Sequence, residues 1–327
     1  MERGIVAGRL HYYGIPTGKL RRYFSLENLW DLFRVAAGIV RSWALVRRLR
    51  PDVLFSKGGF VSVPPVVAAS MLGVPVVSHE SDADPGLATR INARFSRQIC
   101  VAYESTRQCF RSRYQTRVTV TGNPLRDEIL RGSRNDGLQY LGFSVADPRP
   151  VVLFLGGSLG ARQINELVDG LLPTISTRWR VVHQTGTGHR VDVRRSDHYA
   201  AAYFGLELPD ILAAADLVVC RAGASTLWEV AVLGLPMLLV PLMGGSRGDQ
   251  VRNAAIFERA GAAVCLTSAE SLARDVAAWL DRYARDQDQM RMMGDRARAL
   301  VSVDAAERIA DIVAGYLQTA PESSRRA

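Results

Sequence analysis

VVLFLGGSLGARQINEL, residues 151–167, is the stretch of sequence that decides the fold. Its first five residues are apolar without alternation, which predicts a strand buried on both faces of a parallel sheet. The glycine pair that follows predicts a tight turn, and a helix is expected to begin near Leu159. Backbone N–H groups at a helix start have no partner inside the helix, so the segment predicts a site for an anionic phosphate. The Ser158 hydroxyl would add a donor there.

Short apolar runs and helical stretches alternate on both sides of this segment. The runs are rich in β-branched residues, as expected for strands of a parallel sheet. Strands are predicted at residues 52–55, 74–78, 98–102, 117–121, 151–155, 179–184, 217–220, 237–240 and 263–266. Two blocks of strand–helix repeats predict an α/β fold with two doubly wound, Rossmann-like domains.

The break between the blocks is polar and rich in turn-forming residues. At 327 residues, and with roughly 150 residues per domain, two domains are expected. We assign residues 1–126 to an N-terminal domain and 127–327 to a C-terminal domain. The last helix, about 303–327, is expected to pack back on the N-terminal domain.

A second glycine-containing turn repeats the pattern of the first. Residues 215–236, ADLVVCRAGASTLWEVAVLGLP, predict a strand, a turn and a helix that Ser225 or Thr226 would cap. Glu229 lies about one turn inside this helix, where a carboxylate can accept hydrogen bonds from both hydroxyls of a ribose. The alternative is that Glu229 only balances the helix dipole. Two such turns on neighbouring strand–helix units favour a nucleotide site. A single one is weak evidence, because many tight turns use glycine only for its backbone flexibility.

A third polar segment follows the next predicted strand. Residues 240–254, VPLMGGSRGDQVRNA, place Gln250 just beyond the strand end. Its amide both donates and accepts hydrogen bonds, which suits sugar hydroxyls.

Titratable side chains gather after a predicted strand in the first half of the chain. Residues 78–90, SHESDADPGLATR, place His79, Glu80 and Asp82 at the strand end where open α/β sheets bind ligands. His79 is either a base or a hydrogen-bonded turn residue, and spacing alone favours the second interpretation. No metal-binding spacing occurs among the five scattered histidines, so no metal site is expected.

Composition and motifs exclude several classes of protein. With 48% hydrophobic and 22% charged residues, the chain is globular rather than disordered or fibrous. The formal charge of +9 suits an anionic partner, but no basic and aromatic module of a nucleic-acid binder occurs. The glycine turns match neither a P-loop nor the dinucleotide fingerprint. The four cysteines contain no C-x-x-C pair, which fits a reducing cytosol.

One predicted helix, residues 25–50, carries both apolar and basic side chains, with Ser25 as its N-cap and Pro51 closing it. One interpretation is a helix that packs on a sheet and exposes its charged face to water. The other is that part of its apolar surface contacts anionic lipid. No membrane span and no signal peptide are expected. The basic residues that frame the helix are Lys19, Arg21, Arg22, Arg41, Arg47, Arg48 and Arg50.

Several motifs in a fixed order resemble one enzyme family. The motifs are GKLRRY (18–23), PDVLFSKGGFVSVP (51–64), HESDADPGLATR (79–90), GNPLR (122–126), GGSLGARQIN (156–165), HQTG (183–186), ADLVVCRAGASTLWE (215–229), LGLPMLLVPL (233–242) and DQVRNA (249–254). Together they resemble MurG, the bacterial lipid I N-acetylglucosaminyltransferase family. The resemblance implies a GT-B fold, with a cleft between its two Rossmann-like domains.

The resemblance also implies a reaction. GlcNAc would pass from UDP-GlcNAc to the 4-hydroxyl of MurNAc in undecaprenyl-pyrophosphoryl-MurNAc-pentapeptide (lipid I), with inversion, to give lipid II. This step serves peptidoglycan synthesis, cell shape and cell division. The implied partners are UDP-GlcNAc, lipid I, an anionic membrane surface and other cell-wall synthesis proteins, without nucleic acid or a cofactor. The implied location is the cytoplasm, peripheral on the inner face of the cell membrane.

The resemblance gives roles to individual residues. Glu229 would hold the ribose, Ser158 the diphosphate and Gln250 the GlcNAc hydroxyls, with Gly205 near the uracil. His79 and Glu80 are the candidate catalytic residues and would face the sugar or the acceptor. Arg126 would lie at the interdomain cleft. The full expected substrate-binding set is Asp82, Arg126, Ser158, Asn165, Gly205, Ala224, Ser225, Thr226, Leu227, Trp228, Glu229 and Gln250.

The chain departs from the family pattern at its start. The family opens with a strand and a GGTGGH-like glycine loop whose histidine is a candidate base, and residues 1–17 contain no such segment. The missing unit amounts to roughly 35–45 residues, about one βαβ unit. We therefore expect a start codon assigned too far downstream or a truncated gene. The alternatives to an active enzyme are a non-catalytic relative that binds UDP-sugar and a GT-B transferase with another acceptor.

Overall fold

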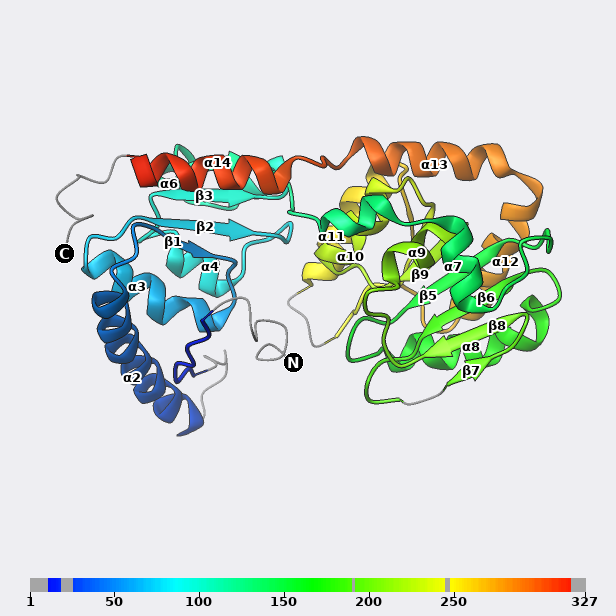
Figure 1. The fold of residues 1–327 in the computed structure, drawn as a ribbon, viewed down its shortest axis with the longest axis horizontal. Coiled ribbons are helices and arrows are strands. Elements are labelled where there is room, and N and C mark those ends of the chain that lie inside the picture. The colour runs from blue at the N-terminus through cyan, green and yellow to red at the C-terminus, as the bar shows by residue number, and fades with distance from the viewer. Residues whose placement is uncertain (1–10, 19–25, 190–191, 245–247, 319–327) are drawn as a thin grey trace. The chain divides into compact units, whose positions relative to one another are not determined.

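A computed structural model describes residues 11–18, 26–189, 192–244 and 248–318 (Figure 1). Contacts between Cα atoms divide the chain into two compact units. The first unit comprises Met1–Thr121 together with Glu307–Ala327, and the second comprises Gly122–Ala306. Residues 307–318 therefore belong to the same unit as the first part of the chain.

The first unit is built on a four-stranded parallel sheet in the order β1-β2-β3-β4. All five residues of β2 are buried, because helices cover the sheet. Its elements are α2 (Leu26–Leu49), β1 (Leu54–Ser56), η1 (Phe60–Ser62), α3 (Val63–Met71), β2 (Val76–Glu80), α4 (Leu87–Asn92), β3 (Gln98–Val101), α5 (Glu104–Arg107), α6 (Ser112–Gln115), β4 (Val118–Val120) and α14 (Ala305–Gln318).

Two long helices of the first unit differ in what they cover. Helix α2 packs against α3, and Gly38 allows a close approach to the ring of Pro64. Helix α14 covers the sheet, because Ile309 packs in one cluster with Val77 of β2 and Cys100 of β3. The C-terminal helix thus completes the core of a unit whose other residues come from the start of the chain.

The second unit is built on a seven-stranded sheet in the order β11-β10-β9-β5-β6-β8-β7. All neighbouring strands are parallel except β7 and β8. Its elements are η2 (Asp127–Arg131), α7 (Arg134–Leu141), β5 (Val151–Leu155), α8 (Arg162–Ile175), β6 (Arg180–Gln184), β7 (Val193–Arg194), β8 (His198–Ala201), α9 (Leu208–Ala214), β9 (Leu217–Cys220), α10 (Ala224–Val232), β10 (Met237–Leu239), α11 (Asp249–Arg259), β11 (Val264–Cys265), α12 (Leu272–Arg285) and α13 (Gln287–Ala299).

The predicted α/β class is confirmed, and each of the nine predicted strand ranges overlaps an observed strand. Strands β7 and β8 were not predicted, because the polar residues before them break the apolar pattern. The helix expected to begin near Leu159 begins at Arg162 instead. Gly160 has a positive φ and Ala161 is extended, so neither residue continues a helix back to Leu159.

The predicted helix at residues 25–50 corresponds to α2. The predicted N-cap Ser25 and the basic residues Lys19, Arg21 and Arg22 lie outside the described residues. Among the helices that the structure describes, none is long and apolar enough to cross a membrane.

Candidate functional site

Strands β5 and β9 mark the point where the strand order of the second unit reverses. They are hydrogen-bonded neighbours, yet the chain continues from β5 to β6 on one side and from β9 to β10 on the other. Open α/β sheets bind ligands beyond the carboxyl ends of the strands at such a point. The two glycine-containing turns predicted as phosphate sites follow these two strands directly.

The turn after β5 packs backbone against backbone on the turn after β6. A Cβ atom on Gly186 would lie 2.1 Å from Cα of Gly160, and both glycines have positive φ. The N–H of Thr187 donates to the carbonyl of Ser158 at 3.3 Å. The Ser158 side chain itself is exposed. These contacts hold the turn in one conformation, with the predicted diphosphate ligand Ser158 at its surface.

Gln184, at the end of β6, joins this turn to the loop that contains Gly205. Its Nε2 donates to the carbonyl of Gly157 at 3.1 Å, and its Oε1 accepts from the N–H of Phe204 at 3.0 Å. The N–H of Gly205 donates to Glu207 at 3.1 Å. The predicted diphosphate and uracil residues therefore belong to loops that one side chain connects.

The turn after β9 leads into α10, whose N-cap is Gly223. The first backbone hydrogen bond of this helix runs from the N–H of Leu227 to the carbonyl of Gly223 at 3.0 Å. The N–H groups of residues 224–226 precede that bond and have no partner within the helix, so they can donate to an anion. Ser225 and Thr226 were predicted as caps, but both lie inside the helix and no side chain caps it.

Glu229 forms an ion pair with Arg126. The guanidinium Nη2 lies 2.9 Å from Oε1 of Glu229, and Nε donates to the same oxygen at 3.0 Å. Burial raises the pKa of Glu229, and the nearby guanidinium opposes that shift. Nearby, Gly122 lies against the ring of Trp228, the residue before Glu229: an added Cβ would be 3.0 Å from Cη2. The ion pair thus brings two predicted site residues together.

Gln250 and Asn253 of α11 connect the third polar segment, residues 240–254, to the edge of the sheet at the carboxyl ends of its strands. The N–H of Leu242 donates to Oε1 of Gln250 at 2.9 Å, which orients the amide group of the side chain. Nδ2 of Asn253 donates to the carbonyl of Ala222 at 3.2 Å and so supports the turn before α10.

Three other residues of the predicted binding set lie inside the fold. Nδ2 of Asn165 donates to the carbonyl of Thr185 at 3.0 Å, and its Oδ1 is 3.0 Å from Nε2 of His183. Leu227 and Trp228 are almost fully buried. These side chains support the turns, and a contact of their own with substrate stays a prediction.

The two predicted catalytic residues lie at the end of β2 in the first unit, and both are buried. The carboxylate of Glu80 accepts from the N–H groups of Asp82 and Gly86, each at 3.2 Å. Burial raises the pKa of Glu80. Nζ of Lys57 lies 3.3 Å from Nδ1 of His79. Glu80 therefore anchors the loop that contains Asp82, a half-buried residue.

Sequence reasoning missed Lys57 and Gln184. The pKa of Lys57 is lowered by burial, while the Glu80 carboxylate opposes that shift. Lys57 directly follows β1, the neighbour of β2, and Gln184 ends β6, the neighbour of β5. A polar residue at the end of a strand next to a predicted site strand is the signal that would have found them. Among the described residues, no group of three His, Cys, Asp or Glu side chains is placed to hold a metal ion.

Comparisons with known proteins give the family. Residues 1–101 match the glycosyltransferase family 28 N-terminal domain, and residues 151–310 match the C-terminal domain of that family. The chain is 38% identical to a Treponema denticola protein over 96% of this chain and 84% of that protein. It is 41% identical to a Bacillus cereus protein over 85% of this chain and 78% of that protein.

Solved structures confirm the GT-B fold of two Rossmann-like domains. Acinetobacter baumannii MurG superimposes with a TM-score of 0.69 at 23% identity, covering 96% of this chain and 87% of that chain. Neisseria meningitidis UDP-GlcNAc 2-epimerase bound to UDP-GlcNAc superimposes with a TM-score of 0.64 at 14% identity, covering 92% and 84%. Both Treponema and Bacillus relatives carry one name, and the chain belongs to their family, the UDP-N-acetylglucosamine–N-acetylmuramyl-(pentapeptide) pyrophosphoryl-undecaprenol N-acetylglucosamine transferases.

Proposed function

We infer that this chain is a glycosyltransferase that moves GlcNAc from UDP-GlcNAc to lipid I and so produces lipid II for peptidoglycan. Family membership supports this reaction, because the relatives are named for it. One observation supports the binding of UDP-GlcNAc in particular: the turns after β5 and β9 lie at the strand-order reversal, and Glu229 lies one turn inside α10.

We propose the following arrangement of the donor. The N–H groups of residues 224–226 and the Ser158 turn bind the diphosphate, because both present backbone donors at a helix start. Glu229 accepts hydrogen bonds from the two ribose hydroxyls, and Gln250 binds hydroxyls of GlcNAc. The loop at Gly205 lies near the uracil, as the bond from Phe204 to Gln184 supports.

On the acceptor side we propose that His79 and Glu80 serve the reaction at the end of β2. An inverting transfer needs a group that takes the proton of the attacking hydroxyl. The Lys57 ammonium beside Nδ1 of His79 and the raised pKa of Glu80 make Glu80 the better proton acceptor of the two. His79 then positions Lys57 and the acceptor.

The test of the reaction is transfer of radiolabelled GlcNAc from UDP-GlcNAc to a short-chain lipid I analogue. We expect lipid II formation by the full chain and by Glu166→Ala, an exposed position on α8. Donor binding without transfer to any acceptor would identify a non-catalytic relative. Transfer to another polyprenyl acceptor but not to lipid I would identify a different acceptor.

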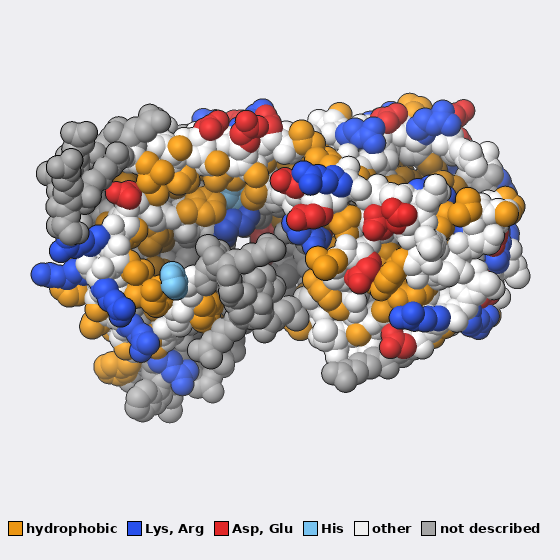
Figure 2. Space-filling view, in the orientation of Figure 1, with side chains coloured by type: hydrophobic (Ala, Val, Ile, Leu, Met, Phe, Trp, Pro, Cys, Tyr) orange, Lys and Arg blue, Asp and Glu red, His pale blue; other side chains and the backbone are white. Residues whose placement is uncertain are grey.

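We further propose that the enzyme works on the cytoplasmic face of the membrane and contacts anionic lipid through α2. The outer face of this helix exposes Phe33 and Val40, and Arg34 and Arg41 lie beside them. Figure 2 shows Lys and Arg side chains in a row over this helix. Gly38 and Ser42 are buried, so the helix has a separate inner face.

Vesicle flotation tests the lipid contact. We expect binding to phosphatidylglycerol vesicles, weak binding to phosphatidylcholine vesicles, and loss of binding in Phe33→Ser/Val40→Ser. Met292→Ser, which removes an exposed apolar side chain of the second unit, is the control and should bind like the parent chain. Equal binding of the double variant and the control would contradict the role of α2.

A further inference from the structure

A cavity of about 480 Å³ lies at the edge of the second unit's sheet opposite the proposed donor site. It is lined by residues at the amino ends of the central strands: Pro150 precedes β5, Arg180 begins β6 and Asp216 precedes β9. The glycine turns follow the carboxyl ends of β5 and β9. The cavity is therefore a separate place in the same unit.

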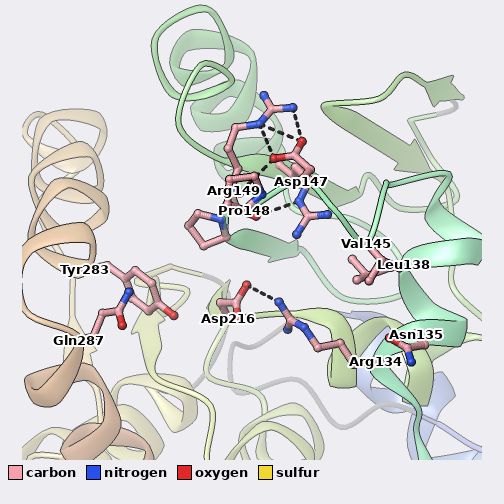
Figure 3. A pocket seen from close by; sticks show the side chains of 12 residues that line it. Arg134, Asn135, Leu138, Val145, Asp147, Pro148, Arg149, Asp216, Tyr283 and Gln287 are labelled. Atoms are coloured by element: carbon pink, nitrogen blue, oxygen red, sulfur yellow. Dashed lines mark hydrogen bonds and ion pairs between the residues drawn. The ribbon is translucent and has the colours of Figure 1, made fainter.

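Two of its three arginines are neutralised by aspartates (Figure 3). Asp147 accepts three hydrogen bonds from the guanidinium of Arg149, with Nη2 donating to Oδ2 at 2.6 Å, and one from its backbone N–H. This contact lowers the pKa of Asp147 to about 2. Asp216 pairs with Arg134 at 3.1 Å and also accepts from the N–H of Val151 at 2.8 Å. Both carboxylates are thus committed within the fold.

Arg180 is the third arginine, and its side chain is only 2% exposed. Its Nε donates to the carbonyl of Arg149 and its Nη1 to that of Ser144, each at 2.9 Å. Its guanidinium also lies 5.5 Å from the centre of the Phe143 ring, a cation–π contact. In the part of the chain that the structure describes, no carboxylate forms an ion pair with Arg180. A guanidinium has five N–H donors, so three donors are not used by these two bonds.

The charge of the cavity follows from these contacts. Three guanidinium groups face two carboxylates, which leaves one positive charge, and it belongs to the most buried of the three. Burial disfavours this charge, as the lowered pKa of Arg180 indicates. Buried charges in proteins are normally paired, because an unpaired one is costly. The carboxylates of Asp147 and Asp216 offset part of this cost, but each is bonded to another arginine. An anion beside Arg180 would give its guanidinium a direct partner.

We propose that this cavity is a binding site for a small organic molecule that carries a single carboxylate, which pairs with Arg180. The single excess positive charge favours a monoanion, because a second negative charge would have no further excess cation among the lining residues. The cavity has the size of a small-molecule site. The side chains of Asn135 and Gln287 line it and can bind polar groups of the ligand, while Leu138 and Val145 provide apolar surface.

Ligand-observed NMR on the full chain tests the proposal, with N-acetylglycine as the carboxylate probe and N-acetylglycinamide as its neutral match. We expect saturable binding of the acid and none of the amide. Val145 is 68% exposed at the cavity, so changing it should not disturb the core. Val145→Glu places a tethered carboxylate there and should weaken binding of the acid at least fivefold, whereas Val145→Gln should not. Arg180→Met should abolish binding.

Any one of three outcomes would overturn the proposal: the same response for the acid and the amide, equal affinity of Val145→Glu and Val145→Gln for the acid, or displacement of the acid by UDP-GlcNAc. The last result would place the probe in the donor site. Because UDP-GlcNAc binding is measured separately on the same variants and should stay unchanged, failure here is distinguishable from failure of the proposed transferase activity. The Val145 pair keeps the test decisive even if Arg180→Met does not fold.

Discussion

The two units use the carboxyl ends of their parallel strands in different ways. In the second unit this edge presents backbone N–H groups at two glycine-containing turns. In the first unit the same edge presents the side chains of Lys57, His79 and Glu80. Backbone N–H groups suit the binding of a diphosphate, which gains negative charge as the sugar leaves, whereas titratable side chains suit the movement of a proton. The fold thus offers two different chemistries from one strand–helix pattern.

The largest change in substrate affinity is expected from substitution of Glu229, the side chain that we assign to the ribose of the donor. Glu229→Ala removes two hydrogen bonds to ribose, each worth about 1.5–3 kcal/mol because the acceptor is charged. Two such bonds amount to about 3–6 kcal/mol, so we expect the Kd for UDP-GlcNAc to rise at least about 100-fold, with thermal stability nearly unchanged. Titration calorimetry measures this, with Glu166→Ala as the control. A change below fivefold would remove Glu229 from the ribose site.

The second prediction concerns the backbone contact between the turn after β5 and the turn after β6. Gly186→Ala places a Cβ against Gly160 at a residue with φ of 92°, so the two turns must separate. We expect a loss of about 3 kcal/mol in the free energy of unfolding and weaker UDP binding. Gly170→Ala on α8 meets nothing within 4 Å and should raise stability by about 0.5–1 kcal/mol. Urea denaturation compares the two variants, and equal stabilities would contradict the close packing.

The third prediction uses pH to separate the units. The pKa of Glu80 is raised by burial above its ordinary value of 4.5, so the folded state binds a proton more tightly than the unfolded state. This contribution to stability is complete below pH 4.5 and is lost as pH rises through the raised pKa. We expect Glu80→Gln to flatten the fall in the free energy of unfolding over that range. Glu104→Gln, an exposed position of the same unit, should retain the slope.

The smallest effect is expected from the ion pair of Arg126 and Glu229. This arginine is half-exposed and occupies the carboxylate that we assign to ribose. Arg126→Met removes a competitor worth about 0.5–1 kcal/mol, so uridine should bind about two- to fivefold more tightly. UDP should gain less, because its diphosphate loses a nearby cation. Displacement of a fluorescent UDP analogue gives the Kd of UDP and the Kd of uridine. An unchanged ratio of the two would contradict competition between Arg126 and ribose for Glu229.

Residue patterns predicted the strands well and the contacts of side chains less well. The buried run at residues 151–155 and the glycine turn after it were readable because parallel strands and tight turns depend on local sequence. The start of α8 was misplaced by three residues because the backbone angles of Gly160 and Ala161 are set by the neighbouring turn. The pairing of Arg126 with Glu229 spans 103 residues, and no spacing predicts such a contact.

The same limit applies to the predicted site residues. Residues with the right chemistry were found at strand ends, because topology places those ends together. Asn165 has the chemistry of a sugar ligand, yet its amide is bonded to Thr185 and His183 inside the fold. Burial distinguishes such a residue from Ser158, which is exposed, and burial depends on tertiary packing.

Helix α14 relates the order in which the chain is synthesised to the order in which its two units can fold. The second unit is one continuous segment, so it can fold as soon as it has left the ribosome. The first unit is begun first but lacks the cover that Ile309 and its neighbours give to Val77 and Cys100. A nascent chain that stops before residue 307 would expose this apolar sheet surface to chaperones, although most of its sequence has already been synthesised. The half of the enzyme that is translated first is therefore the half that matures last.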